Sequence, residues 1–326
     1  MTGSAIKGFD AEFRDLDQYI RVITDRIWEG RRIDDIHRYY SDDCAVETPS
    51  SVSIGTTAVI EGTRATLVAF PDRRLLAEDI IISGDGEGGF LSSHRILSPM
   101  THAGPGAFGP ASGKAVLVRT IADCVCINNR IVHEWLVRDQ AAIARQIGLR
   151  ERDLAQRWLN ERGGFAKPAM PVPPAPYVSW VDPGELAQNY AALYRQIWSS
   201  AEMSLLSSHC HEQVIAATPG GETLLGAAAL AGFWQTVVAS FSDAQFEVEH
   251  LVCNARAGRA TSVAMRWRVR AVHAGTGRYG APSGHTVEVM GISHADFEDG
   301  RIRREWVLMD DVAIWMQVLK PQLHAT

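Results

Sequence analysis

HEWLVRD, residues 133–139, and REWVLMD, residues 304–310, are two versions of one pattern. In each, a glutamate stands beside a tryptophan, three mostly apolar residues follow, and an aspartate closes the stretch. Alternate side chains of an extended strand share one face. Each aspartate is therefore predicted to lie on the same face as its tryptophan, Asp139 with Trp135 and Asp310 with Trp306.

These two stretches belong to a longer internal repeat. A helical stripe at Leu16, Ile20, Ile23 and Ile27 recurs 170 residues later, and from Phe70 onward the offset is 171. Between residues 102–143 and 273–314, 17 of 42 positions are identical, far more than chance gives. The chain is therefore predicted to be a tandem duplication.

The order of patterns within each copy predicts the fold class. Helical periodicity comes first, strand-like runs joined by the turn pairs Asn128-Asn129 and Asp299-Gly300 follow, and a short helix closes the copy. This order predicts an α+β fold with a curved antiparallel sheet packed by helices. A proline-rich segment separates the copies, which predicts a first domain at 1–162, a linker at 163–182 and a second domain at 183–326.

Composition limits the classes of function. The 326-residue chain has a formal net charge of −6, which argues against nucleic-acid or anionic-membrane partners. No apolar run approaches the roughly 20 residues of a membrane span, and the N-terminus lacks the apolar core of a secretory signal. Five scattered cysteines are interpreted as reduced, so a cytoplasmic location is expected.

Several short motifs, in this order and spacing, resemble a known family. They are Phe70-Pro71-Asp72, Thr101-His102-Ala-Gly and Ile131-Val-His-Glu-Trp135 with Asp139, and the second copy repeats them around His273, Trp306 and Asp310. The combination resembles the SnoaL-like polyketide cyclases, also called ester cyclases. The resemblance implies two tandem copies of the cone-shaped fold shared by nuclear transport factor 2 and ketosteroid isomerase.

The resemblance also implies a site in each copy. The aspartate after the tryptophan would act as a base, assisted by the histidine, without metal or organic cofactor, which selects Asp139 with His102 and Asp310 with His273. A desolvated carboxylate has a raised pKa, which suits a proton acceptor. The residues expected to contact a substrate are Trp135, His94, Tyr40, Met100, Trp306 and Trp267. Alternatively, each aspartate is only the N-cap of the helix that follows it.

The expected function is cofactor-independent acid–base chemistry on a small carbonyl-bearing or polyketide-like molecule, such as aldol-type cyclisation, isomerisation or dehydration. Two alternatives stay open: a non-catalytic ligand-binding or scaffold protein, and an epoxide hydrolase, which would need an Asp–Arg–Asp cluster. The two copies are expected to form an intramolecular pseudo-dimer, and further homo-oligomerisation stays open. The first copy carries the polar residues Tyr40, Glu47 and His94 where the second has Cys210, Ala217 and Met265.

Overall fold

The computed structural model describes residues 6–85, 89–173 and 183–321. Within them the chain forms two compact units: residues 139–166 and 183–321 make up the second, and residues 6–85, 89–138 and 167–173 the first. The unit boundary therefore precedes the predicted boundary at residue 162, because the two helices after Arg138 group with the second unit. Residues 174–182 of the predicted linker lie outside the described part of the chain.

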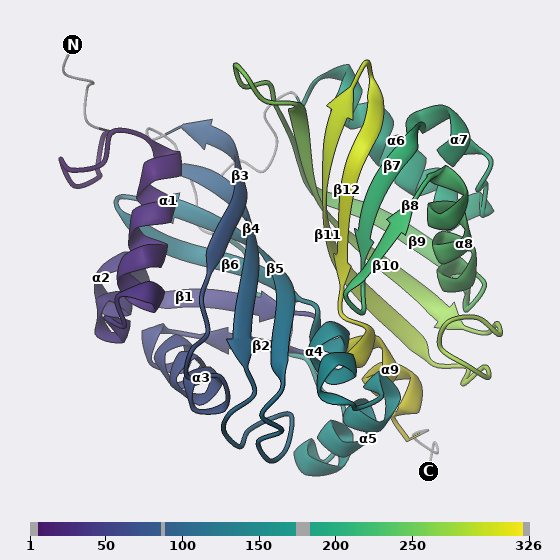
Figure 1. Ribbon diagram of the computed structural model, residues 1–326, viewed down its shortest axis with the longest axis horizontal. Coiled ribbons are helices and arrows are strands. Elements are labelled where there is room, and N and C mark those ends of the chain that lie inside the picture. The colour runs from purple at the N-terminus through teal and green to yellow at the C-terminus, as the bar shows by residue number, and fades with distance from the viewer. Residues whose placement is uncertain (1–5, 86–88, 174–182, 322–326) are drawn as a thin grey trace. The chain divides into compact units, whose positions relative to one another are not determined.

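The first unit contains one six-stranded sheet in the order β2-β1-β6-β5-β4-β3 (Figure 1). β1 runs parallel to β6, and the other neighbours are antiparallel. Its elements are α1 (Leu16–Thr24), a π-helical turn (Asp25–Glu29), a 3-10 turn (Ile33–Asp35), α2 (Ile36–Tyr39), β1 (Tyr40–Thr48), β2 (Ser51–Ile54), α3 (Thr56–Ala69), β3 (Leu76–Asp85), β4 (Gly89–Thr101), β5 (Ala115–Ile127) and β6 (Arg130–Arg138).

The second unit repeats this sheet in the order β8-β7-β12-β11-β10-β9, again with one parallel pair, β7 with β12. Its elements are α4 (Gln140–Ile147), α5 (Glu151–Arg162), α6 (Gly184–Ser200), α7 (Leu205–His209), β7 (Cys210–Thr218), β8 (Glu222–Leu225), α8 (Ala227–Val238), β9 (Phe241–Asn254), β10 (Thr261–His273), β11 (Thr286–Glu298), β12 (Arg301–Met309) and α9 (Asp311–Leu319). The α+β duplication predicted from the sequence is thus confirmed. The parallel pair in each sheet was not predicted.

Local sequence explains where the strands turn. Asn128, Asn129, Asp299 and Gly300 all have positive φ angles, as the predicted two-residue hairpins require. Glycines with nearly identical backbone angles, Gly55 and Gly226, precede α3 and α8. Since they are 171 residues apart, the two helices align residue by residue.

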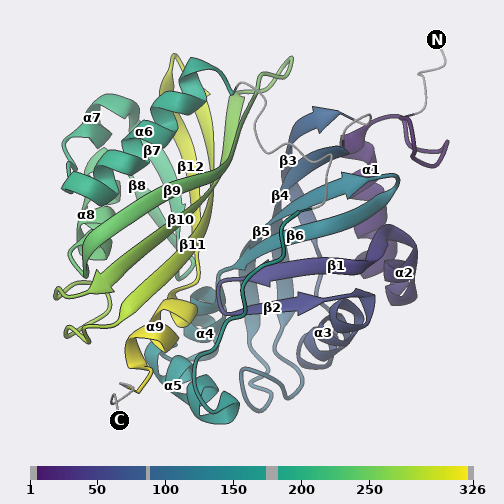
Figure 2. The ribbon, with the colours of Figure 1, turned by 180° about the vertical axis from the view of Figure 1, so that it is seen from behind.

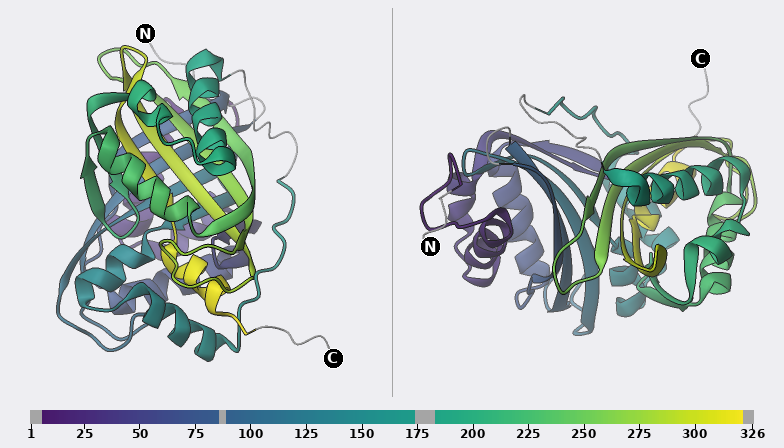
Figure 3. Two further views of the ribbon diagram at one scale, coloured as in Figure 1. Left: turned by 90° about the vertical axis from the view of Figure 1, so that its right-hand side faces the viewer. Right: turned by 90° about the horizontal axis from the view of Figure 1, so that it is seen from above.

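In each unit, helices pack against one face of the sheet. Figure 2 shows β1 and β2 beside α3, and Figure 3 shows α6, α7 and α8 in front of the second sheet. The first core joins α1 to β3, β4 and β5 through residues such as Ile20, Ile23 and Ile80. The second core is larger, and its buried residues include Trp198, Trp234 and Trp267, whereas the buried aromatic residues of the first core are phenylalanines and tyrosines. Among the described helices, none is long and apolar enough to cross a membrane.

Candidate active site

A cavity of about 240 Å³ lies inside the first unit, between the helices and the sheet. Helices α1 and α3 form its mostly apolar roof, where Gly62, Thr63 and Thr66 of α3 leave space because their side chains are small. Strands β1, β4, β5 and β6 form its floor. Its volume is somewhat below the roughly 300–1,000 Å³ that is typical of ligand sites. The cavity therefore suits a compact molecule.

Glu134 is the carboxylate that lines this cavity among the described residues. It lies on β6, is 6% exposed, and accepts a hydrogen bond of 3.2 Å from the Tyr40 hydroxyl of β1. Burial raises the pKa of Glu134 to about 7, although the Tyr40 bond and the charge of Arg138 oppose the shift. Burial also raises the pKa of Tyr40, so the phenol stays protonated and donates. Glu134 can therefore gain or lose a proton near neutral pH.

His94, on β4, also lines the cavity and is 3% exposed. Its Nε2 atom has no hydrogen-bond partner in the described part of the chain. Burial lowers the pKa of His94 to about 3; nearby Arg21 and Arg95 lower it as well, against Asp17 and Asp79. The imidazole is thus neutral at physiological pH, and it can offer a hydrogen bond to a ligand.

The side of β6 that was predicted to face the substrate, with Trp135 and Asp139, is not the side that lines this cavity. Glu134, Leu136 and Arg138 line the cavity, whereas Trp135 and Asp139 do not. Trp135 is buried on the opposite face, with its ring 4.4 Å from that of His133. The prediction failed because side chains on both faces of β6 are buried, so alternation alone does not identify the cavity side. The glutamate repeated in both motifs was the available signal.

Asp139 occupies the N-cap of α4, as the alternative interpretation proposed. Its carboxylate accepts hydrogen bonds of 2.9 Å from the backbone N–H groups of Ala142, Gly220 and Gly221. Burial raises the pKa of Asp139 to about 6, and the three N–H groups limit that rise. Asp139 belongs to the second unit, whereas His102 belongs to the first.

Asp310 is the N-cap of α9 and accepts bonds from Val312 and Ala313. With fewer donors than Asp139, its pKa is raised further by burial, to about 8. His102 and His273 are each joined to a serine through Nδ1 at 3.1 Å, Ser112 and Ser283 respectively. In both histidines Nε2 is buried without a partner among the described residues, and burial lowers the pKa.

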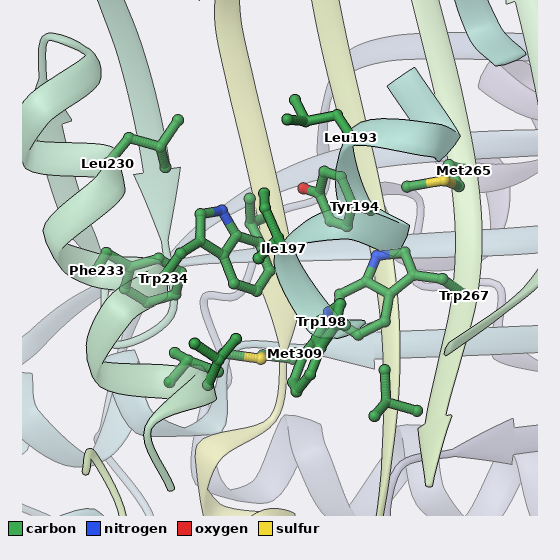
Figure 4. Packing of buried hydrophobic residues seen from close by; sticks show 14 of the residues in the cluster. Leu193, Tyr194, Ile197, Trp198, Leu230, Phe233, Trp234, Met265, Trp267 and Met309 are labelled. Carbon is green, nitrogen blue, oxygen red and sulfur yellow. The ribbon is translucent and has the colours of Figure 1, made fainter. Parts of the chain in front are cut away.

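Of the six predicted substrate contacts, His94 and Tyr40 line the cavity of the first unit. Met100 is buried on β4 outside the cavity lining, and Trp306 lies on the face of β12 opposite Glu305. Trp267 fills the core of the second unit, where Trp198, Trp234 and Tyr194 surround it (Figure 4). Sequence reasoning missed the cavity residues Arg73, Thr120, Glu134 and Arg138.

Three positions equivalent to the cavity lining hold large aromatic side chains in the second unit. At an offset of 171, Gly62, Thr63 and Ile96 correspond to Phe233, Trp234 and Trp267. Glu305, the counterpart of Glu134, accepts hydrogen bonds from the hydroxyls of Tyr190 and Tyr194 at 2.7 and 2.9 Å. Among the described residues, no cluster of three or more His, Cys, Asp or Glu side chains could hold a metal ion.

Comparison with known proteins agrees with the duplication. A family model described as SnoaL-like polyketide cyclase matches residues 18–147 and again residues 188–318. A solved SnoaL-like polyketide cyclase from Agrobacterium tumefaciens is 20% identical; the match covers 42% of this chain and 100% of that one, with a TM-score of 0.35. TsrD from Streptomyces laurentii is also 20% identical, over 41% of this chain and 98% of its own, with a TM-score of 0.35. No curated protein matches the sequence.

Proposed function

The chain belongs to the SnoaL-like polyketide cyclase family in both of its halves, and from this premise we propose that its first domain is a cofactor-independent acid–base enzyme. The substrate class is a small carbonyl-bearing, polyketide-like molecule. The site is the cavity of the first unit, and the proton carrier is Glu134.

The observation that supports this proposal most directly is a buried carboxyl group that lines an apolar cavity and has a pKa of about 7. A general base works best when its pKa is near the operating pH, because it is then both ionised and basic enough. Desolvation in an apolar pocket is the usual way in which a carboxyl group reaches this range. Tyr40 holds one carboxylate oxygen in place through its hydrogen bond.

The proposed step is the removal of a proton from the carbon next to a substrate carbonyl. The Glu134 carboxylate takes the proton, and the electron pair of the C–H bond moves into the enolate. Neutral His94, with its proton on Nε2, donates a hydrogen bond to the developing oxyanion. In cyclisation the enolate carbon then attacks a second carbonyl, whose oxygen becomes an alkoxide and takes the proton from Glu134. In isomerisation Glu134 returns the proton to another carbon. Both outcomes use the same two side chains.

This assignment differs from the roles predicted for Asp139 with His102 and for Asp310 with His273, which stay predictions. The carboxylate of Asp139 is occupied by three backbone N–H groups, which stabilise its charge and weaken it as a base. An epoxide hydrolase would need a second acid. Glu134 is the single acidic side chain among the described residues of the cavity lining.

The test is exchange of hydrogen for deuterium at carbons next to the carbonyl of small ketones and diketones in D₂O, followed by NMR. Wild-type protein should accelerate exchange, with a rate that rises with pH through about 7 as Glu134 ionises. Glu134→Gln should reduce the acceleration by about 10²–10⁴-fold. The matched variant Glu305→Gln should retain it, because Glu305 bonds to two tyrosines of the filled core.

Asp139→Asn provides the contrast with the sequence-based prediction and should also retain exchange. If Asp139→Asn, and not Glu134→Gln, removes the acceleration, the aspartate is the base and the proposal fails. Wild-type protein that accelerates exchange of no compound in the panel, yet binds members of it, would support the alternative of a non-catalytic binding protein.

A further inference from the structure

Two arginines line the same cavity as Glu134. Arg73 lies in the loop between α3 and β3, and Arg138 is the last residue of β6. On the strand ladder, Arg138 lies directly opposite Thr120 of β5, whose side chain also lines the cavity. Opposite residues in neighbouring strands have side chains within contact distance. The like charge of Arg138 lowers the pKa of Arg73, so the two guanidinium groups lie near each other, and we take them with the Thr120 hydroxyl as one end of the cavity.

The loop that carries Arg73 is held tightly against its surroundings. Nη2 of Arg31 donates to the carbonyl oxygens of Pro71 and Arg73 at 2.8 and 3.1 Å. The Asp72 carboxylate accepts bonds from the backbone N–H and the hydroxyl of Thr101, both at 2.7 Å. These contacts fix the backbone on both sides of Arg73. The backbone that carries the buried Arg73 side chain is thus held in place.

The buried position of Arg73 lowers the stability of the folded protein. It is 6% exposed, and its Nε atom has no hydrogen-bond partner in the described part of the chain. Burial, together with the like charges of Arg138 and Arg31, lowers the pKa of Arg73 against the opposite charge of Glu29. A buried charge that is not paired destabilises a folded protein by several kcal/mol. Thr120 adds a buried hydroxyl oxygen that also lacks a partner among the described residues.

The fold itself does not require these groups. At the equivalent positions of the second unit, Arg73 is replaced by Ala244, Arg138 by Met309 and Thr120 by Gly291. Gly291 and Met309 lie opposite each other on that ladder, as Thr120 and Arg138 do on theirs. The polar end is therefore found in the domain that has the cavity and is missing from its filled counterpart. This is the distribution expected of a ligand site.

We propose that the Arg73–Arg138 end of the cavity binds the carboxylate of a small organic acid, with Thr120 donating to the same group. A guanidinium group matches the two oxygens of a carboxylate with two parallel N–H donors. The rest of the lining is largely apolar, including Ile23 and Ile96, and fits a hydrocarbon or aromatic body. The size of the cavity limits that body to a compact one.

The inference deepens the proposed function, because a substrate held by its carboxylate at one end would present a carbonyl group to Glu134. A role of the arginine end in catalysis therefore rests on the proposed function, but carboxylate binding at that end does not. Carboxylate binding is measurable without turnover. Failure of one proposal can thus be separated from failure of the other.

Isothermal titration calorimetry with benzoate, phenylacetate and cyclohexanecarboxylate, each beside its neutral amide, tests the site. The full-length wild-type protein should bind at least one acid about tenfold or more tightly than its amide. Arg73→Met should weaken the binding of that acid by about tenfold or more, since the loss of one charge-assisted hydrogen bond changes affinity by this order. The neighbouring Arg74 is exposed and pairs with Glu29, so the matched Arg74→Met should change affinity by less than about threefold.

Three outcomes would overturn the inference: equal affinity of wild-type protein for every acid and its amide, unchanged binding by Arg73→Met, or inorganic phosphate binding as tightly as the acids. If Arg73→Met does not fold, Arg138→Met is measured in its place with the same expectation. The Glu134→Gln variant should still bind the acid more tightly than its amide. An ionised Glu134 repels a bound carboxylate, so its charge cannot be the source of that preference. Selective binding without proton exchange would mean that the proposed function alone has failed.

Discussion

The two domains have the same strand order and the same helix against the sheet, yet one holds a cavity where the other holds aromatic rings. Thr63 of α3 corresponds to Trp234 of α8, and Ile96 of β4 corresponds to Trp267 of β10. In the second domain these rings lie 6.4 Å apart, centre to centre, in a single core cluster. The fold therefore accommodates large aromatic rings at positions that border the cavity in the first domain. This difference between the copies is why we assign the small residues around the first cavity to function.

The same contrast applies to polar groups. Trp267 fits because Gly291 faces it: a Cβ atom at position 291 would lie 2.1 Å from the Trp267 ring. The first domain has Thr120 at that position and therefore has no room for a tryptophan at position 96. Both domains keep a buried glutamate, but Oε1 of Glu305 accepts bonds from two tyrosine hydroxyls, whereas Glu134 accepts one from Tyr40 and lines the cavity. The glutamate that we propose as the proton carrier is therefore the one that lines a cavity.

The largest expected effect comes from removing a tryptophan ring from the core of the second domain. Trp234→Ala should lower the free energy of unfolding by about 3–5 kcal/mol, since it removes a large buried ring and leaves a void. The matched Thr63→Ala should change it by less than about 1 kcal/mol, because the threonine borders an existing cavity. Urea denaturation of both variants measures the difference. Equal costs would mean that the two helices do not occupy equivalent places.

Local patterns in the sequence were sufficient for the duplication, the α+β class and the hairpin turns, because periodicity and turn chemistry act over a few residues. They were insufficient for the site. Both faces of β6 are buried, so alternation could not tell Glu134 from Trp135. The Arg73 loop and the hydrogen bonds of Asp139 to Gly220 and Gly221 depend on segments far apart in sequence. Such contacts have no signature in a single stretch.

The second prediction separates the two aspartates that end the repeated motif. Both oxygens of Asp139 accept backbone N–H bonds, so the amide nitrogen that Asp139→Asn introduces would face donors, and this substitution should cost about 1–3 kcal/mol of stability. Both bonds to Asp310 end on one oxygen, and an asparagine side chain at this position retains an oxygen that can accept them. Asp310→Asn should therefore not destabilise the protein. A matched pair of urea denaturation curves decides, and equal losses would contradict the difference.

The third prediction concerns pH. The pKa of Asp310 is about 8 in the folded protein, above the ordinary aspartate value of 3.8, so between these values the folded state holds a proton that the unfolded state has released. Stability from this group is therefore full below about pH 4 and is lost as pH rises through about 8. Its slope is at most about 1.4 kcal/mol per pH unit. Asp139, with a pKa of about 6, loses its contribution earlier.

Asp310→Asn should remove the Asp310 contribution to the slope up to about pH 8 and leave the contributions of Asp139, up to about pH 6, and Glu134, up to about pH 7. Because Glu134 contributes with the same sign, the quantity to compare is the difference in unfolding free energy between wild type and variant at each pH. That difference should increase from pH 6 to pH 8 in favour of the variant. A constant difference would show that Asp310 does not titrate in this range.

The smallest expected effect tests whether the tyrosine–glutamate contact of the first domain tunes a reactive group. The Tyr40 bond lowers the pKa of Glu134 against the rise caused by burial, so Tyr40→Phe should raise that pKa further. A single long hydrogen bond is worth about 1 kcal/mol, which corresponds to a shift of up to about one pH unit. The pH at which deuterium exchange reaches half its maximal rate should therefore move upward by that amount, with the plateau retained. Tyr190→Phe removes a tyrosine bond to Glu305 in the second domain and should leave the profile unchanged. A profile that moves with Tyr190→Phe and not with Tyr40→Phe would place the reactive carboxyl group in the second domain and reverse the comparison.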